Sequence, residues 1–161
     1  MAEQIIVPSR LAQNIQSLIG AIGEQQVLLR LALFCHQHPE WRVYQNVGDS
    51  GYDILLETRR KRVPIEVKTR QGMFSVQGKN RAFHFTLTKG EHDRSEFLVA
   101  YILDSNDFFI VPTEDLSPVP GGRSWRFSVG RRKDGSFSEH ARPFHHAWHL
   151  ISADLRDCPA L

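Results

Sequence analysis

The sequence has few cysteines, no membrane-length apolar run and no signal-peptide pattern after Met1, and each shortage argues against a class of protein. Cys35 and Cys158 are the two cysteines among 161 residues, too few for the disulfide framework of a small secreted domain. No internal repeat is present either. We therefore expect an intracellular, cytoplasmic protein of a reducing compartment that does not associate with membranes.

The net charge is also close to zero: the sequence has 20 Lys and Arg residues and 18 Asp and Glu residues, which gives a formal charge of +2. Nucleic-acid binding would therefore require that basic clusters gather on one side of the molecule. The length fits one domain with a core and little room for a separate recognition domain. We expect a single domain over residues 1–161, with a core at about 12–112 and a C-terminal hairpin and tail at about 113–161.

The most specific pattern lies within residues 51–69, where a Gly-Tyr-Asp run ends at Asp53 and an Ile-Glu-Val-Lys run contains Glu66 and Lys68. Side chains in a strand alternate between two faces, so Glu66 and Lys68 share the face opposite the apolar residues. The residues after Asp53 alternate in the same way. Two half-buried strands are therefore predicted on either side of the basic run 59–62.

The register of this hairpin decides whether the two acids meet. If the hairpin is roughly symmetric about its basic turn, Asp53 lies opposite Glu66, with both side chains on one face about 5 Å apart. The turn has no Asn-Gly or Asp-Gly to fix the register, and a slip of one residue would separate the acids. Burial of the apolar face, which includes Ile54 and Ile65, opposes such a slip. The alternative is that these are ordinary charges on the wet face of a hairpin.

This order of residues resembles the PD-(D/E)XK nuclease superfamily, which includes type II restriction enzymes, archaeal Holliday junction resolvases and some homing endonucleases. The resemblance covers roughly residues 12–112: a helix carrying a glutamate, the Asp strand, the Glu-x-Lys strand and a later apolar strand. It departs at residues 50–51, Ser-Gly, where the name-giving Pro-Asp often stands. Within the superfamily, the pattern of 97–112 and the Ala-Trp pair at 147–148 most resemble endonucleases encoded in group I introns.

The resemblance implies an α/β (α+β) fold of the restriction-endonuclease type, a central mixed β-sheet flanked by helices, with an additional C-terminal β-hairpin. The pattern of the chain is consistent with it. Strands are predicted at about 83–87, 97–103 and 108–111, and a capping box at 88–91 would open a short helix. A loop at 117–122 precedes the second hairpin, in which Trp125, Phe127 and Val129 alternate and Asp134-Gly135 supplies the turn signal.

A long helix is expected from Ser9, a candidate cap, to about His38, where the next residue is a proline. Its core-facing stripe is formed by apolar residues at three- and four-residue intervals: Ile15, Leu18, Ile19, Ile22, Val27 and Leu31. Glu24 follows Gly20 and Gly23, whose missing side chains would let another backbone or a metal-bound phosphate approach. By the resemblance, Glu24 takes the place of the helix glutamate that contributes to the metal site. The alternative, of equal weight, is that Glu24 simply lies on the solvent face of the helix.

The resemblance, together with strand parity, implies hydrolysis of DNA phosphodiester bonds with Mg²⁺, for which Mn²⁺ would substitute. Asp53 and Glu66 would hold the ion, with the Val67 carbonyl as a further ligand and Glu24 at a second metal position. Lys68, about 7 Å along the strand from Glu66, would reach the attacking water or the scissile phosphate. It would favour hydroxide or offset charge on the phosphorane. The expected catalytic residues are thus Asp53, Glu66, Lys68 and Glu24.

Basic and polar residues of the turns and of the loop after Lys68 are candidate contacts to DNA, although such clusters are often merely solvated: Arg59, Arg60, Lys61, Arg70, Gln71, Lys79, Arg81, Arg131, Arg132 and Lys133. We predict a site-specific endonuclease of homing or restriction type that cuts both strands. A Holliday junction resolvase is the nearer alternative, and a non-catalytic DNA-binding module is the other. Both enzymatic functions imply a homo-oligomer, a dimer or tetramer, because one chain supplies one active site.

Three histidines, His145, His146 and His149, crowd near Trp148 and raise the question of a zinc site. No cysteine pair accompanies them, and structural zinc sites usually combine four ligands at characteristic spacing. We therefore expect packing and surface roles for these three and for the other histidines: His36, His38, His84, His92 and His140.

Overall fold

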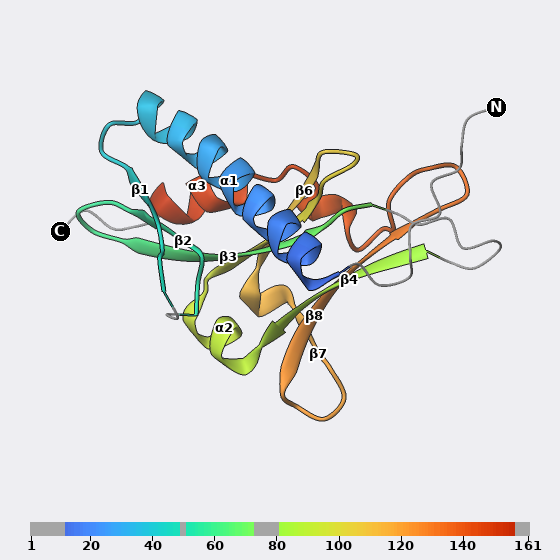
Figure 1. Cartoon of the computed structure of the whole chain (residues 1–161). Coiled ribbons are helices and arrows are strands. Elements are labelled where there is room, and N and C mark those ends of the chain that lie inside the picture. Colours follow the sequence, from blue (N-terminus) through green and yellow to red (C-terminus); the bar gives the residue numbers. More distant parts are fainter. Residues whose placement is uncertain (1–11, 49–50, 73–80, 157–161) are drawn as a thin grey trace.

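Two β-sheets form the framework of the structure, a computed structural model that describes residues 12–48, 51–72 and 81–156 (Figure 1). The larger sheet has the order β1-β2-β3-β5-β6, with β1 at Arg42–Gln45, β2 at Ile54–Glu57, β3 at Arg62–Arg70, β5 at Phe97–Ile102 and β6 at Asp107–Pro112. Strands β3 and β5 are parallel and the other neighbours antiparallel, so this sheet is mixed. The smaller, antiparallel sheet has the order β4-β8-β7, with β4 at Arg81–Thr88, β7 at Ser117–Pro118 and β8 at Ser124–Arg131.

Helices and the smaller sheet cover opposite faces of the larger sheet (Figure 1). Helices α1 (Gln13–Gln37) and α3 (His149–Arg156) cover one face, over a core that includes Val99 and Ile110. Strands β4 and β8 cover the other face, over a core that includes Leu98 and Phe109, and α2 (Lys89–Arg94) packs against them. Two short 3-10 helices, η1 (Thr113–Asp115) and η2 (Arg142–Phe144), lie in the connections.

The predicted fold class, a mixed sheet flanked by helices, is confirmed. Every residue of β5 is buried, as expected for a strand covered on both faces. The predicted capping box is also present: the Thr88 hydroxyl accepts from the Glu91 N–H, and the Glu91 carboxylate accepts from the Thr88 N–H.

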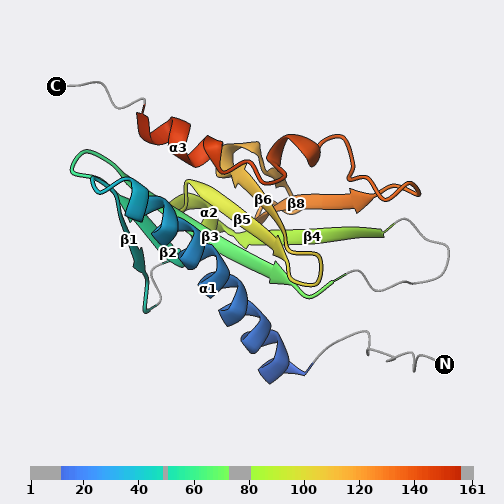
Figure 2. The same cartoon turned by 90° about the horizontal axis from the view of Figure 1, so that it is seen from above.

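Helix α1 matches the prediction at its end but not along its whole apolar stripe. It stops at Gln37, just before the proline at position 39, whereas Ser9 lies outside the described residues. Ile19, Val27 and Leu31 are buried, and Ile22 is partly buried. The prediction was wrong for Ile15 and Leu18, which are 43% and 60% exposed, because the first turns of α1 extend past the strands (Figure 2).

Helix α1, with 25 residues, is long and apolar enough to cross a membrane by length and composition alone. Among the described residues it is the one weak exception to the expectation of no membrane-length apolar run, because helices buried in protein cores have the same length and composition. In this structure, Val27 and Leu31 of α1 pack into the core beneath the larger sheet's β3 and β5.

The C-terminal third is built around β8 rather than around a free-standing hairpin. Strand β8 pairs along its whole length with β4, from Thr88 opposite Ser124 to Arg81 opposite Arg131. The predicted turn after β8 is present, and the returning chain pairs through an isolated bridge between Arg131 and Phe137. Within the loop predicted at 117–122, residues 117 and 118 form the short strand β7. A pairing partner 40 residues upstream gives no local sequence signal, which is why the smaller sheet was not predicted.

The two glycines before Glu24 differ in their surroundings. A Cβ on Gly23 would lie 1.7 Å from the Thr69 hydroxyl oxygen on β3, whereas a Cβ on Gly20 would meet nothing within 4 Å. The close approach predicted here is therefore made by β3, and only at Gly23.

Substitution Gly23→Ala should force α1 away from β3 and lower the free energy of unfolding by roughly 1–3 kcal/mol, the usual cost of overpacking a core. The matched control, Gly20→Ala, should leave stability unchanged or raise it by about 0.5–1 kcal/mol, because alanine is the better helix former. Urea unfolding measures both. Equal stability of the two variants would contradict this account of how α1 docks.

Candidate active site

The hairpin of β2 and β3 has the predicted register. Ile54 pairs with Ile65, so one further step along the ladder sets Asp53 opposite Glu66. Asp53 lies just outside the paired residues, and its N–H donates to the Ile65 carbonyl at 3.0 Å. Burial of both isoleucines fixes this register, since neither has exposed surface.

The carboxyl groups of Asp53 and Glu66 converge. Oδ2 of Asp53 accepts a hydrogen bond from the Val67 N–H at 2.8 Å, which ties the aspartate to β3. The charge of Asp53 raises the pKa of Glu66, so the two carboxyl groups lie close enough to interact electrostatically. The Glu66 side chain is only 6% exposed. Two acids that the sequence separates by a hairpin are thus neighbours on one face of the sheet.

Lys68 lies beside this pair. Its ammonium donates to Glu66 Oε1 at 2.7 Å and to Glu91 Oε1 at 2.8 Å. The side chain keeps 31% of its surface exposed, so the site opens to solvent at the lysine. The structure therefore groups Asp53, Glu66 and Lys68 as the motif predicts, although their catalytic roles stay predictions.

Glu24 of α1 lies at the border of the site rather than on the solvent face. It is half-buried on the part of α1 that lies beside β1, where the neighbouring Gln25 donates to the Gln45 side chain at 3.0 Å. Burial raises the pKa of Glu24, and the nearby charge of Asp53 raises it further. Glu24 therefore lies close enough to Asp53 for the two acids to interact electrostatically. The Val67 carbonyl stays a predicted ligand.

Glu91 was missed by the sequence analysis. As third residue of α2 it completes the capping box, and its second carboxylate oxygen binds Lys68. The sequence predicted the capping box, which fixes the direction of the Glu91 side chain. It did not predict the contact with Lys68, 23 residues earlier, because that contact depends on how β4 brings the chain back to the site.

Burial dominates the electrostatics of the site. It raises the pKa of Glu66 to about 8 even against the hydrogen bond from Lys68, and it raises the pKa of Asp53 in the same direction. For Lys68, burial would lower the pKa, but the hydrogen bonds that its ammonium donates to Glu66 and Glu91 outweigh this effect and raise the pKa. For Glu91, burial would raise the pKa, but the hydrogen bond to Lys68 reverses the direction. Lys68 is therefore held as a cation and Glu66 as a readily protonated acid.

This donor set fits a hard divalent cation. Asp53 and Glu66 offer carboxylate oxygens on one face of the hairpin, and burial raises the pKa of both, so a cation bound there would replace protons as the partner of these acids. Mg²⁺ prefers oxygen ligands and is usually held by one or two carboxylates together with substrate phosphates.

The predicted DNA contacts do not form one cluster. The turn with Arg59, Arg60 and Lys61 lies at one end of the molecule, and the turn that begins at Arg131 lies at the opposite end (Figures 1 and 2). Arg59 and Arg60 are exposed. Lys61 lies 3.6 Å from Glu96.

Several of the basic groups are engaged within the protein. Arg131 contacts Asp107 at 3.4 Å, and Arg132 contacts Glu139 at 2.8 Å. Arg70 donates to the His84 carbonyl at 3.1 Å. Lys133 is exposed, and Gln71 is partly buried. Of the other two candidates, Lys79 lies outside the described residues, and the Arg81 side chain is not described.

The histidines divide into two groups. His36 and His38 are exposed, and His92 stacks on Trp125 at 4.0 Å between ring centroids. His84 contacts the Ser128 hydroxyl at 2.8 Å and His140 contacts the Ser128 carbonyl. These five have the surface and packing surroundings that we expected, and so does His149, which is exposed. His145 and His146 instead converge on Asp107.

Comparison with known proteins shows the fold. No family model and no curated protein matches the chain. A bacterial homing endonuclease, I-Ssp6803I, matches with a TM-score of 0.62 and 18% identity, over 89% of this chain and 98% of that one. An Archaeoglobus fulgidus Holliday junction resolvase, Hjc, matches with a TM-score of 0.54 and 14% identity, over 83% and 95%. Both are nucleases of the restriction-endonuclease-like fold, and this chain shares that fold.

Replacement of Glu91 by alanine should lower the free energy of unfolding by about 1–2 kcal/mol, because it removes the reciprocal cap of α2. Its matched control is Lys89→Ala in the same helical turn, which breaks only an exposed pair with Asp93 and should change stability little. Thermal or urea unfolding distinguishes the two. If Lys89→Ala cost as much as Glu91→Ala, the capping role assigned to Glu91 would be wrong.

Proposed function

We propose that this chain, which has the restriction-endonuclease-like fold, is a Mg²⁺-dependent DNA endonuclease with its active site at Asp53, Glu66 and Lys68. One observation carries the proposal: the register of the β2–β3 hairpin sets the two acids opposite each other on one face, and a lysine cation lies beside Glu66. Both structural matches are described as nucleases, which supports the same reaction class.

Asp53 and Glu66 would hold Mg²⁺, with Glu24 completing a second position and Mn²⁺ able to substitute. Mg²⁺ bound there supplies positive charge to the phosphoryl oxygens. The Val67 N–H orients Asp53 through its hydrogen bond. The buried setting of Glu66 strengthens every charge interaction that the site makes with a phosphate.

Lys68 acts as an electrostatic group in this proposal. Its raised pKa keeps the ammonium protonated at neutral pH, which favours stabilisation of phosphorane charge over proton abstraction from water. Glu91 acts as a positioning residue. When Glu66 binds a metal ion, the Glu91 carboxylate still holds the lysine in place at the open side of the site.

Double-strand cleavage of homing or restriction type is the mode that we favour, because the homing endonuclease gives the higher TM-score and coverage of the two matches. The resolvase match supports Holliday junction cleavage as the second candidate. Either mode is most simply served by a homo-oligomer, since cutting two strands needs two active sites. DNA contacts would come from the basic turns, with Arg59, Arg60 and Lys133 reaching solvent most directly.

Purified protein should nick supercoiled plasmid in the presence of Mg²⁺, and Asp53→Ala and Lys68→Ala should each lower the rate by about 100-fold or more. The control variant is Glu40→Ala, which changes an exposed acid at the far end of α1 and should cleave like wild type. Linear duplex, single-stranded and four-way-junction substrates are compared in the same assay, and a preference for the junction would favour the resolvase mode. Equal cleavage by wild type, Asp53→Ala and Lys68→Ala would remove the site assignment.

The apparent affinity for Mg²⁺ should depend on pH. Glu66, with a pKa near 8, is protonated at pH 7 in the metal-free protein, so Mg²⁺ must displace a proton. The affinity should therefore rise up to about tenfold per unit between pH 6 and about 8 and level off above, if one proton is displaced. Calorimetric titration of the DNA-free protein measures it, with Glu66→Gln as the variant that cannot release this proton. An affinity that stays constant from pH 6 to 8 would contradict the proposed role of Glu66.

A further inference from the structure

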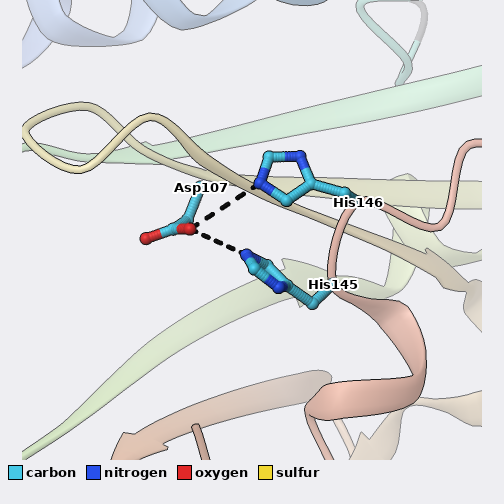
Figure 3. A group of neighbouring side chains, drawn as sticks. All are labelled: Asp107, His145 and His146. Carbon is cyan, nitrogen blue, oxygen red and sulfur yellow. Dashed lines mark hydrogen bonds and ion pairs between the residues drawn. The ribbon is translucent and has the colours of Figure 1, made fainter. Parts of the chain in front are cut away.

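A second cluster of metal-ligating side chains lies away from the proposed active site. Asp107, the first residue of β6, faces His145 and His146, which follow η2 near the end of the described chain. Oδ1 of Asp107 lies 2.7 Å from Nε2 of His145 and 3.7 Å from Nε2 of His146. Figure 3 shows the two imidazoles pointing at the same carboxylate oxygen from different sides.

The backbone holds these three groups together. Strand β6 is the edge strand of the larger sheet, and the 145–146 segment covers that edge. His145 forms an isolated bridge with Phe109, and the His146 N–H donates to the Phe108 carbonyl at 2.7 Å. His146 adopts a positive φ of 50°, a conformation that is uncommon for residues other than glycine and that histidine, asparagine and aspartate adopt more often than most. This backbone conformation turns the second imidazole toward the carboxylate that the first one binds.

Distances between the ligand atoms match a bound ion. Three atoms on a tetrahedral Zn²⁺ with bonds of about 2.0–2.1 Å lie about 3.3 Å from one another. The two measured separations, 2.7 and 3.7 Å, fall on either side of that value, and all three atoms lie within 4.8 Å of one another. Small side-chain rotations would equalise them. Two imidazoles and one carboxylate suit zinc and similar transition metals, whereas Mg²⁺ prefers an all-oxygen set.

The surroundings of Asp107 leave its Oδ1 available. Its other oxygen, Oδ2, accepts from the Ser105 hydroxyl and lies 3.4 Å from the Arg131 guanidinium. Such outer contacts are typical of metal-binding carboxylates. The Asp107 side chain is 12% exposed, while His145 and His146 are 32% and 42% exposed, so the cluster has an open side for a water ligand.

Burial and the neighbouring His145 lower the pKa of His146. The neutral imidazole that results is the form that binds metal. A plain ion pair is the competing explanation, but it needs only one histidine. The second imidazole, aimed at the same carboxylate oxygen, is what the ion pair leaves unexplained.

We propose that Asp107, His145 and His146 bind one divalent transition-metal ion, with Zn²⁺ as the occupant that the ligand chemistry fits best. The ion has a structural role, in which it fastens the segment that leads into α3 onto the edge of β6. The site is separate from the proposed active site, because β5 lies between β3 and β6 in the sheet. Its existence does not depend on nuclease activity.

The test uses untagged full-length protein, stripped of metal and titrated with Co²⁺ as a spectroscopic substitute for Zn²⁺. With excess Mg²⁺ present to occupy the proposed active site, wild type should bind one Co²⁺ per chain with the intense visible absorption of a four-coordinate site, and one equivalent of Zn²⁺ should abolish it. His146→Asn keeps a residue that tolerates the positive φ but removes the imidazole, and it should weaken binding by about 10- to 100-fold or more. His149→Ala is the control, since it removes an exposed histidine three residues away and should bind like wild type.

A second pair of measurements separates this site from the other. Asp53→Ala should keep full Co²⁺ binding with the same spectrum, and excess Mg²⁺ should not displace the Co²⁺. Zn²⁺ should raise the melting temperature of wild type and of His149→Ala but not of His146→Asn. The proposal is overturned if wild type binds no stoichiometric Co²⁺, or if His146→Asn binds it as tightly as wild type, or if binding disappears in Asp53→Ala.

Discussion

The proposed chemistry depends on the register of the β2–β3 hairpin. Strand side chains alternate with a period of two, so the face that carries Glu66 is fixed once Ile65 and Val67 are buried. The same burial of Ile54 on β2 brings Asp53 to that face. A slip of one strand by one residue would turn one of the two acids into the apolar core beneath α1, where an unpaired carboxylate would be far too costly. Apolar packing therefore enforces the catalytic arrangement that we propose, without any turn sequence to specify it.

A second consequence concerns charge. The acids are brought together in a place where water cannot screen them, and Lys68 is shared between Glu66 and Glu91 rather than matched to each. Burial raises the pKa of Asp53 and of Glu66, so protons neutralise part of the negative charge of the site at neutral pH. A divalent cation would take the place of these protons. In this way the need for a metal ion follows from the same packing that sets the register.

Local patterns predicted the parts of this arrangement that depend on local physics. The end of α1 follows from the proline after it, α2 from its capping box, and the full burial of β5 from its continuous apolar run. The predictions were wrong where the structure depends on contacts between residues that are far apart in the sequence. The apolar residues Ile15 and Leu18 look like core residues in a helical pattern, yet the sheet ends before it reaches them. Glu91 reaches the candidate site, and β4 pairs with β8, through contacts between residues that are far apart in the sequence.

The cluster of Asp107, His145 and His146 is another arrangement that local sequence patterns could not predict. Adjacent histidines gave no spacing signal for a metal site, since their partner lies 38 residues earlier on another element. The sheet edge that the histidines cover is what brings the three groups together.

The account's central claim is that Asp53 and Glu66 hold one divalent ion between them. Diffraction from crystals grown with Mn²⁺, measured at a wavelength where manganese scatters anomalously, locates such an ion directly. We predict an anomalous peak in contact with carboxylate oxygens of both residues, and the claim is contradicted if the manganese peaks lie elsewhere while Glu66 keeps only its bond with Lys68.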